Sequence, residues 1–528
     1  MKNCSTSKLW LLAYLALAGV FFCPRIANHS EAEDAFTYAR EVEERPYREI
    51  LHPNHRLYHP LAKAVFELSG AEKSYHVLVG LSRAGAVLAL GFFYLLLRDL
   101  GVGGEGRRFA LVAGLALTYG FWRYAHEVEV YAVGSAILLG VIWLVFRLPE
   151  KGRGVLCALL IVFALNVHRA LGPPLVVLAL AYLVGRKDWR GLAFALLFLP
   201  SAYLITERLA DLTSVTRAQP RDELAVLLHE ELRSQRAVDR AEATLSPASV
   251  PKAVVGLGSA VVGTNLIMGV DPVYELLQNR LFPYRFLEEE RMMAEGWPLW
   301  QITLWTLCLL GVVVLGLVMA WQLRALPGQW RGWSAQTWAV ILAAGAYGAM
   351  IFAFEPGNPE MWLLGVPLFW LMAALLTRAV ASRWLAGWVA CLAMGNFLGG
   401  ISLLADEERD YHYVTSAEVR REARPGDLYL LGVTNAVHDR YVNYRVKNLT
   451  IISVPRQSAR FAEFYQLLSN EIKGGRRVFV HETLSERKGG FGEDLADFGL
   501  VYEPGMSIAG GGELRLAPPA GDLESRIE

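Results

Sequence analysis

The chain has 528 residues, of which 54% are hydrophobic and only 19% are charged. A soluble core of that size could not bury so much apolar surface, so the composition excludes a soluble globular protein and indicates a polytopic membrane protein. Lysine plus arginine and aspartate plus glutamate both number 51, so no overall positive field favours nucleic acid as a partner. The five cysteines lie in or beside hydrophobic segments and indicate no disulfide framework.

Eleven segments are apolar enough to be interpreted as transmembrane helices, which need about 20 residues when they cross the bilayer upright. The first follows Lys2 and Lys8, but no small-x-small cleavage site comes after it, so we interpret it as an uncleaved helix. Three segments are short and are expected to be half-buried or broken inside the bundle. The predicted spans are 8–23, 76–97, 109–122, 129–146, 155–168, 170–185, 191–206, 298–321, 335–354, 360–377 and 384–404, of which the short ones are 109–122, 155–168 and 170–185.

Every second connecting loop is rich in positive residues, which resist translocation across a membrane. If these loops lie inside, an odd number of spans places the tail outside. We therefore expect a transmembrane domain over 1–404, with outer loops 24–75 and 207–297, and an outer soluble domain over 405–528. The compact inner loops and the lack of an organelle signal favour a prokaryotic plasma membrane. The positive residues are Arg98, Arg107, Arg108, Arg147, Lys151, Arg153, Arg186, Lys187, Arg190, Arg324, Arg331, Arg378 and Arg383.

The first outer loop begins with the acidic pair Glu33 and Asp34. Apolar residues follow at helical spacing, which predicts an amphipathic helix on the membrane surface with Asp34 at its beginning. These residues are Ala35, Phe36, Ala39 and Val42. One interpretation makes the pair a reactive carboxylate site. The other makes it a solvated helix start whose charge complements the helix dipole.

The same loop ends with three histidines, His52, His55 and His59. Neutral imidazole is the commonest metal ligand, and the spacing would fit a helix, but Pro53 and Pro60 are expected to break that helix. We therefore favour hydrogen bonds from the histidines to a charged ligand, with a divalent metal site as the alternative. No other cofactor is implied.

Charged residues also occur at the predicted membrane boundary. Glu127 and Glu129 are costly near hydrocarbon unless they are paired or reach water, and their spacing points them to different sides of a helix. One could face a site, or both could mark solvated helix ends. Arg83 lies inside span 76–97 and is expected to face protein or the site.

Two further outer junctions carry polar residues. His168 and Arg169 suit a phosphate, because guanidinium offers a planar fork of donors. The alternative is an interfacial anchor that snorkels to the headgroups. Asn358 and Glu360 lie in a hairpin with two prolines and a glycine, which either displays them toward the same external cavity or is a simple turn.

The second outer loop and the tail differ from the spans. Residues 222–243 are polar and helical, whereas 250–270 is apolar and glycine-rich, typical of a re-entrant segment or a surface helix. In the tail, short β-rich runs separated by helical stretches predict a small α/β domain with a parallel sheet. The runs are 427–433, 449–454 and 477–481, with a helix over 459–472. This domain would recognise an acceptor or brace the loops. No glycine motif follows a strand, so nucleotide binding has no support.

Taken together, the motifs resemble the GT-C membrane glycosyltransferases, specifically the protein O-mannosyltransferase-like branch. That branch has an acidic residue after its first helix, a His-Pro motif at the end of the first outer loop, and an aromatic-x-x-x-Glu-Val-Tyr stretch before a later helix. The corresponding residues are Glu33-Asp34, His52-Pro53 with His59-Pro60, and Phe121-Trp122 through Glu129-Val130-Tyr131. The Asn166-to-Arg169 junction resembles the family's turn containing Asn and His. The resemblance covers the first ~190 residues well and the remainder only in outline, and such likeness does not convert directly into a substrate.

Two departures concern substrate identity. His-Pro-Asn-His stands where one related subgroup has His-Pro-Pro-Gly, and the acidic pair is Glu-Asp instead of a start of the Asp-Ser-Gly-Glu type. The donor sugar and the acceptor, whether protein, lipid or glycan, therefore stay open.

The resemblance implies transfer of a sugar from a polyprenyl-phosphate carrier to an acceptor hydroxyl on the outer face of the membrane. Asp34 is expected to act as the base, with Glu33 as the alternative. Arg169, His168, Arg83 and the loop histidines would stabilise the leaving phosphate. A transporter or flippase should show internal repeats, and none is found in the sequence. A non-catalytic assembly subunit, with the tail as its working part, is the remaining alternative.

Overall fold

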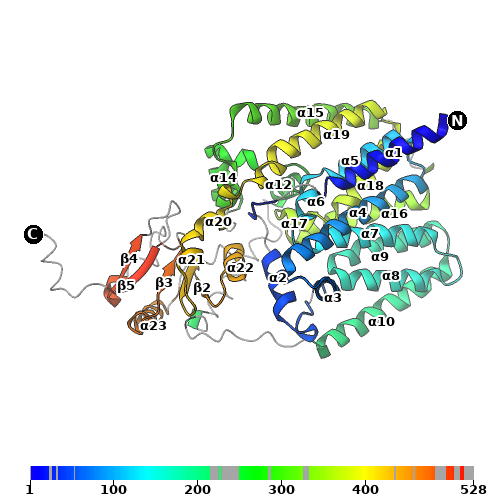
Figure 1. Ribbon diagram of the computed structural model, residues 1–528. Coiled ribbons are helices and arrows are strands. Elements are labelled where there is room, and N and C mark those ends of the chain that lie inside the picture. The colour runs from blue at the N-terminus through cyan, green and yellow to red at the C-terminus, as the bar shows by residue number, and fades with distance from the viewer. Residues whose placement is uncertain are drawn as a thin grey trace, which may run out of the picture.

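The structure is a computed structural model. It describes residues 2–22, 26–30, 34–52, 54–213, 224, 227–228, 249–282, 287–324, 332–432, 436–455, 458, 460–481, 484, 495–504 and 512–516. Figure 1 shows a large bundle of helices with a smaller part containing a β-sheet at one end.

Six helices in the described residues are long and apolar enough to cross a membrane. They are α4 (Ser74–Asp99), α7 (Val130–Arg147), α10 (Trp189–Thr213), α15 (Leu299–Leu323), α16 (Ala335–Phe354) and α19 (Ser382–Asn396), which continues through η8 (Phe397–Ile401) and η9 (Leu403–Ala405). The other predicted spans form shorter helices, so eleven crossings stay a prediction. They are α1 (Lys2–Gly19), α5 (Glu105–Ala116), α6 (Tyr119–Tyr124), α8 (Arg153–Val167), α9 (Gly172–Gly185), and α17 (Pro359–Trp362) with α18 (Val366–Leu376) and η7 (Thr377–Ala379).

The predicted span 109–122 is broken, because α5 ends at Ala116 and α6 starts at Tyr119. Thr118, between them, has an extended backbone with ψ of 128°, and its hydroxyl donates to the Gly114 carbonyl at 2.8 Å. The break is held by packing, since the Trp370 indole nitrogen donates to the Thr118 hydroxyl at 2.9 Å. A short, interrupted apolar segment is thus accommodated inside the bundle, where neighbouring helices satisfy its polar groups.

Close helix contacts are made at small residues. Helix α4 packs against α7, α9 against α16, and α15 against α19. A Cβ at Gly85 would lie 2.9 Å from the Val133 backbone, so α4 and α7 can approach this closely only because Gly85 has no side chain. By contrast, α15 leaves Leu307, Leu310 and Leu317 exposed, as expected of a face turned to lipid.

The positive loops cross-link one end of the bundle. Arg147 forms an ion pair of 2.6 Å with Asp99, and Arg153 forms one of 3.1 Å with Asp188. The Arg107 guanidinium donates to the Val380 carbonyl at 2.7 Å. Helices α2, α3 and α22 lie at the opposite end of the bundle, toward the sheet (Figure 1).

The predicted amphipathic helix of the first loop is α2 (Ala35–Glu44), which is followed by η1 (Tyr47–Glu49) and α3 (Tyr58–Ser69). All four residues of its apolar stripe are fully buried, but they contact α3, α4 and α22, so the helix packs on protein. The Phe36 ring stacks on Tyr75 with centroids 5.2 Å apart. Pro60 lies in the first turn of α3 and does not break that helix, because a missing N–H costs little there. The three histidines still do not share a helix, as expected, because His52 and His55 lie before α3 and only His59 lies within it. Pro53 lies outside the described residues.

The second loop and the tail contain the remaining elements. The expected apolar segment 250–270 forms α12 (Ser249–Val261) and η3 (Asn265–Gly269), whereas nearly all of 222–243 lies outside the described residues. Next come α13 (Asp271–Leu276), η4 (Leu277–Leu281) and α14 (Glu288–Ala294). The tail helices are η10 (Glu407–Arg409), α20 (Tyr411–Thr415), α21 (Ala417–Glu422), α22 (Ala436–Arg445), α23 (Phe461–Lys473) and η11 (Leu495–Phe498).

The tail sheet has five strands in the order β2-β1-β3-β5-β4. Its strands are β1 (Leu428–Gly432), β2 (Thr450–Val454), β3 (Val478–Val480), β4 (Leu500–Pro504) and β5 (Gly512–Leu516). Strands β2, β1 and β3 are parallel and coincide with the three predicted runs. Strands β5 and β4 add an antiparallel edge, so the sheet is mixed where an all-parallel sheet was predicted.

Candidate functional site

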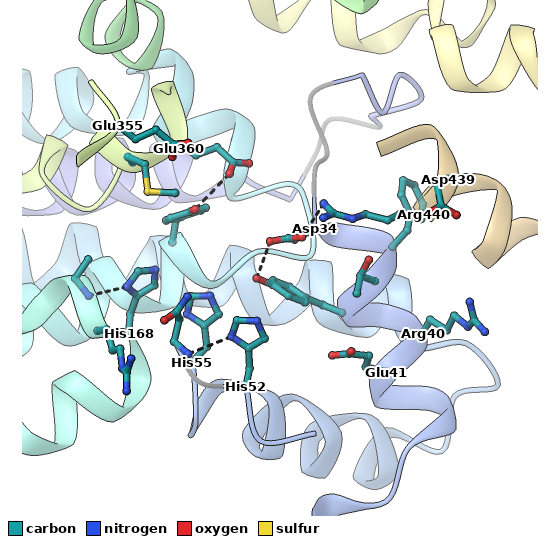
Figure 2. A pocket seen from close by; sticks show the side chains of 18 of the residues that line it. Asp34, Arg40, Glu41, His52, His55, His168, Glu355, Glu360, Asp439 and Arg440 are labelled. Carbon is teal, nitrogen blue, oxygen red and sulfur yellow. Dashed lines mark hydrogen bonds and ion pairs between the residues drawn. The ribbon is translucent and has the colours of Figure 1, made fainter. Parts of the chain in front are cut away.

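A cavity of about 1220 Å³ opens at the end of the bundle that carries α2 and α22. Its walls come from α2, the loop before α3, the junction between α8 and α9, the end of α16, α17 and helix α22 of the tail (Figure 2). It gathers six of the residues predicted for the site, from four separate stretches of sequence: Asp34, His52, His55, His168, Arg169 and Glu360.

Asp34 occupies the position before the first residue of α2, as the periodicity predicted. Its Oδ2 accepts a hydrogen bond from the Tyr38 hydroxyl at 3.0 Å, one helical turn later. Its Oδ1 forms an ion pair of 2.8 Å with Arg440 of α22. Burial and then the Asp34 carboxylate raise the pKa of Tyr38 well above its usual value, so the phenol stays a donor. The side chains of Asp34 and Arg440 are 38% and 33% exposed, so both reach the cavity.

Three histidines form the facing part of the cavity. The His52 and His55 rings are stacked with centroids 4.8 Å apart, and His168 lies 4.5 Å from His55. Two backbone hydrogen bonds join the parts of the chain that carry them: Leu57 N–H donates to the Asn166 carbonyl at 2.9 Å, and Arg169 N–H donates to the Asn54 carbonyl at 3.1 Å. The loop histidines and the His168 junction are therefore held together by the main chain.

His55 is the least satisfied member of this group. Its ring is buried, and Nδ1 has no hydrogen-bond partner. Burial, followed by the neighbouring His168, His52 and His59, lowers the pKa of His55 far below its usual value, so the ring is neutral. A buried nitrogen without a partner costs about 1–3 kcal/mol. A buried polar atom without a partner is rare in native proteins, and a role in catalysis is one explanation for it.

Arg169 lies at the edge of the cavity and has an acidic partner. Its guanidinium contacts both carboxylate oxygens of Glu207, at 2.9 and 2.7 Å. Arg56 contacts the same carboxylate at 2.7 Å. The two guanidinium groups thus share one carboxylate, which leaves one net positive charge at the edge of the cavity for an anionic group. Among the described residues, no group of three or more His, Cys, Asp or Glu side chains could hold a metal ion.

Glu360 enters the cavity from α17 and lies 3.4 Å from the Tyr131 hydroxyl. Asn358, predicted beside it, does not line the cavity. Its side-chain oxygen accepts from the Glu360 N–H at 3.0 Å and so caps α17. The hairpin therefore forms a turn and also directs Glu360 into the cavity.

Three other predicted site residues, His59, Arg83 and Glu129, do not line the cavity. His59 is buried against the Tyr38 ring, with centroids 4.6 Å apart, and its Nε2 is 3.9 Å from Glu41. Glu129 is buried, and its carbonyl accepts from the Ser82 hydroxyl at 3.1 Å. Arg83 lies on α4 and is not part of the lining. Glu33 lies outside the described residues.

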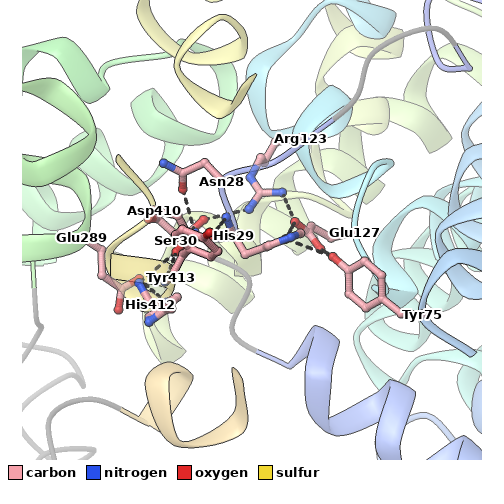
Figure 3. Close-up of polar contacts among 10 residues, drawn as sticks. All are labelled: Asn28, His29, Ser30, Tyr75, Arg123, Glu127, Glu289, Asp410, His412 and Tyr413. Carbon is pink, nitrogen blue, oxygen red and sulfur yellow. Dashed lines mark hydrogen bonds and ion pairs between the residues drawn. The ribbon is translucent and has the colours of Figure 1, made fainter. Parts of the chain in front are cut away.

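Glu127 belongs to a separate buried cluster (Figure 3). Its carboxylate contacts Arg123 at 2.7 Å and His29 at 3.2 Å, and Tyr75 donates to its second oxygen. Burial opposes ionisation of Glu127, but Arg123 and His29 lower its pKa to about 2. The backbone N–H of His29 donates to the Asp410 carboxylate at 2.8 Å. This cluster ties the first loop to the start of the tail, and its carboxylate does not line the cavity.

Tyr38, Tyr131, Glu207 and Arg440 lie at the site but were missed from the sequence. Tyr38 had a usable signal, because it is four residues after Asp34 on a predicted helix and so on the same face. Arg440 had none. It is more than 400 positions away from Asp34 and lies on a helix of the tail whose docking on α2 depends on tertiary structure.

No protein-family model matches the chain, and no curated protein matches it. Among solved structures, the chain is similar to ArnT from Cupriavidus metallidurans, in the apo state and bound to undecaprenyl phosphate. The identities are 12% and 14% and the TM-scores 0.43 and 0.44; the matches cover 98% of this chain in both cases and 100% and 99% of ArnT. Similarity at this level establishes neither a family nor an activity, and neither structure is named as a mannosyltransferase.

Proposed function

We propose that this chain is an integral-membrane glycosyltransferase that moves a sugar from a polyprenyl-phosphate donor to an acceptor hydroxyl. The observation that carries the proposal is the cavity itself, which has a carboxylate, Asp34, on one wall and a cluster of His55, His168 and Arg169 on another. Its volume of about 1220 Å³ exceeds that of ordinary small-molecule sites, so it has room for a sugar phosphate and an acceptor together.

The chemistry requires two different groups at the two ends of the reacting bond. The acceptor oxygen forms a bond to the anomeric carbon and gives its proton to the Asp34 carboxylate. The bond from the anomeric carbon to the phosphate oxygen breaks, and the phosphate keeps the electron pair. Donors from Arg169 and the histidines stabilise the charge on that leaving phosphate.

The location of the cavity supports a reaction on the outer face. Helix α7 runs from Tyr131, which lines the cavity, to Arg147 among the positive loops at the opposite end. Because positive loops tend to stay inside, this polarity supports an outer location for the cavity and the tail. A lipid-linked donor would then enter from the bilayer, with its phosphate at the end of the bundle and its chain along the helices.

The test is turnover by the full chain in lipid nanodiscs, with a polyprenyl-phosphate sugar and an acceptor hydroxyl compound. Asp34→Asn should lower turnover by about 10²–10⁴-fold, the usual contribution of a general base, without changing the unfolding temperature. Glu463→Gln is the matched control, because it removes an exposed carboxylate on α23, far along the chain from the cavity. Wild-type turnover in both Asp34→Asn and Glu33→Gln would overturn the assignment of the base to this acidic pair.

A further inference from the structure

One residue that lines the cavity, Arg440, belongs to the tail and not to the helix bundle. Arg440 comes from α22, between strands β1 and β2 of the tail, and its guanidinium lies beside the Asp34 carboxylate (Figure 2). Both groups line the cavity and both are about one-third exposed. This ion pair joins the candidate base to the tail.

Helix α22 is held firmly on α2, so the position of Arg440 is not accidental. The Tyr441 ring packs against Phe36 with centroids 5.0 Å apart. One turn beyond Arg440, the Tyr444 hydroxyl donates to Glu43 at 2.8 Å. On the other side of α22, His438 is buried and its Nε2 is hydrogen-bonded to the Tyr429 hydroxyl at 2.8 Å. This contact anchors α22 to strand β1. The tail therefore aims one guanidinium into the cavity.

The Asp34 carboxylate is engaged on both oxygens, by Arg440 on Oδ1 and by Tyr38 on Oδ2. A proton from an acceptor hydroxyl must reach one of these oxygens. Exposed ion pairs are weak, whereas a guanidinium binds a phosphate through two parallel charge-assisted hydrogen bonds. A phosphate that enters this cavity can therefore compete with Asp34 for Arg440.

We infer that Arg440 exchanges partners, pairing with Asp34 while the site is empty and with the ligand's phosphate when the donor is bound. The inference rests on the proposed function and adds to it that the tail supplies a phosphate-binding residue. The exchange frees Asp34 Oδ1 only when a donor is present, so base activity is coupled to donor binding. The tail then does more than brace the loops.

The test measures binding, which does not depend on turnover. Farnesyl phosphate is titrated calorimetrically into the full-length protein in detergent, with farnesol and inorganic phosphate as separate probes. Arg440→Gln should weaken farnesyl phosphate binding about ten- to a hundredfold, the loss expected for charge-assisted hydrogen bonds, and Arg440→Lys should restore part of it. Arg445→Gln, on the same helix with its guanidinium over the Tyr441 ring, should bind as the wild type does.

Asp34→Asn distinguishes exchange from a simple phosphate contact. Removing the competing carboxylate should tighten farnesyl phosphate binding up to about fivefold, the strength of an exposed ion pair. This gain should vanish when Arg440→Gln is added. A gain that persists in the double variant would show plain charge repulsion by Asp34 and would overturn the exchange.

The remaining outcomes distinguish a failure of the Arg440 inference from a failure of the proposed function. Wild-type protein that binds farnesyl phosphate no better than farnesol would refute the phosphate-linked donor, and with it the proposed function. Tight wild-type binding that Arg440→Gln and Arg440→Lys leave unchanged would refute only the role of Arg440. Unfolding temperatures of all variants identify any that fail to fold, and Arg440→Lys, which keeps the charge but not the fork, then decides the question.

Discussion

The cavity and the Glu127 cluster lie at the same end of the molecule, yet they satisfy their charges in opposite ways. In the cluster, the fully buried Glu127 carboxylate has partners on both oxygens, Arg123 and His29 on one and Tyr75 on the other. In the cavity, Asp34 and Arg440 form a partly exposed pair, and His55 keeps a buried nitrogen without a partner. Buried, fully paired charges hold a fold together, whereas a partly exposed ion pair is weak and can be exchanged for a ligand.

The largest effect should follow from breaking the buried cluster. Glu127→Gln keeps the shape of the side chain but leaves the Arg123 charge buried without its carboxylate, which should lower the free energy of unfolding by about 3–5 kcal/mol. The measurement is unfolding of the purified protein in detergent. Glu44→Gln is the control, because its pair with Arg40 is exposed and should matter by less than about 1 kcal/mol.

Equal stability of Glu127→Gln and the wild type, together with lost turnover, would reverse the comparison. Glu127 would then act on the substrate, as its place at a membrane boundary first suggested. Loss of stability with residual turnover per folded molecule would support the division between the two clusters.

How much the sequence could predict follows the same division. The helices of the bundle were predictable, because a bilayer requires long apolar stretches with their backbone bonds made internally. Asp34 at the start of α2 was predictable from the spacing of Phe36 and Ala39, which is a local pattern. The distant partners of Glu127 and Asp34 were not, because His29 and Arg440 meet them only through tertiary packing between segments about 100 and 400 residues apart.

The short segments were the least predictable part of the fold. Hydropathy alone does not separate a helix that crosses the bilayer from an apolar helix packed within protein, since both bury the same residue types. The antiparallel strands β4 and β5 were missed for a related reason: their sequences, 500–504 and 512–516, alternate too briefly to stand out.

The next largest effect is expected for His55→Phe, which should leave the protein as stable or more stable but weaken its binding of a phosphate. His55→Phe keeps an aromatic ring against His52 and His168 but removes the unpaired Nδ1. The free energy of unfolding of the empty protein should stay the same or rise by about 1 kcal/mol, because a desolvated group without a partner is lost. Affinity for farnesyl phosphate should fall about tenfold or more.

Calorimetric titration and unfolding of the same samples check both signs. A clear loss of stability with unchanged affinity would show that His55, like Glu127, stabilises the fold and does not bind the ligand. His76→Phe, a change at an exposed histidine at the start of α4, gives the background effect of the substitution.

The smallest effect is a dependence of stability on pH that originates in the tail. His481 is buried beside His438, with ring centroids 4.4 Å apart. Burial, and then His412, lowers the pKa of His481 to about 3. The unfolded chain, with an imidazole pKa near 6.5, binds a proton that the folded chain refuses. Neutral His481 therefore contributes fully to the free energy of unfolding above about pH 6.5. This contribution is lost as the pH falls, by up to about 1.4 kcal/mol per pH unit.

His481→Gln should remove that part of the acid sensitivity, so the variant should lose about 1 kcal/mol less than the wild type between about pH 6.5 and 5.5. Unfolding at several pH values measures the slope, and His76→Gln, at an exposed position, should leave it unchanged. An unaltered slope in His481→Gln would mean that His481 takes up a proton in the folded state. Because strand β1 and His438 anchor the helix that carries Arg440, a real slope would also make donor binding weaken in acid before the bundle itself unfolds.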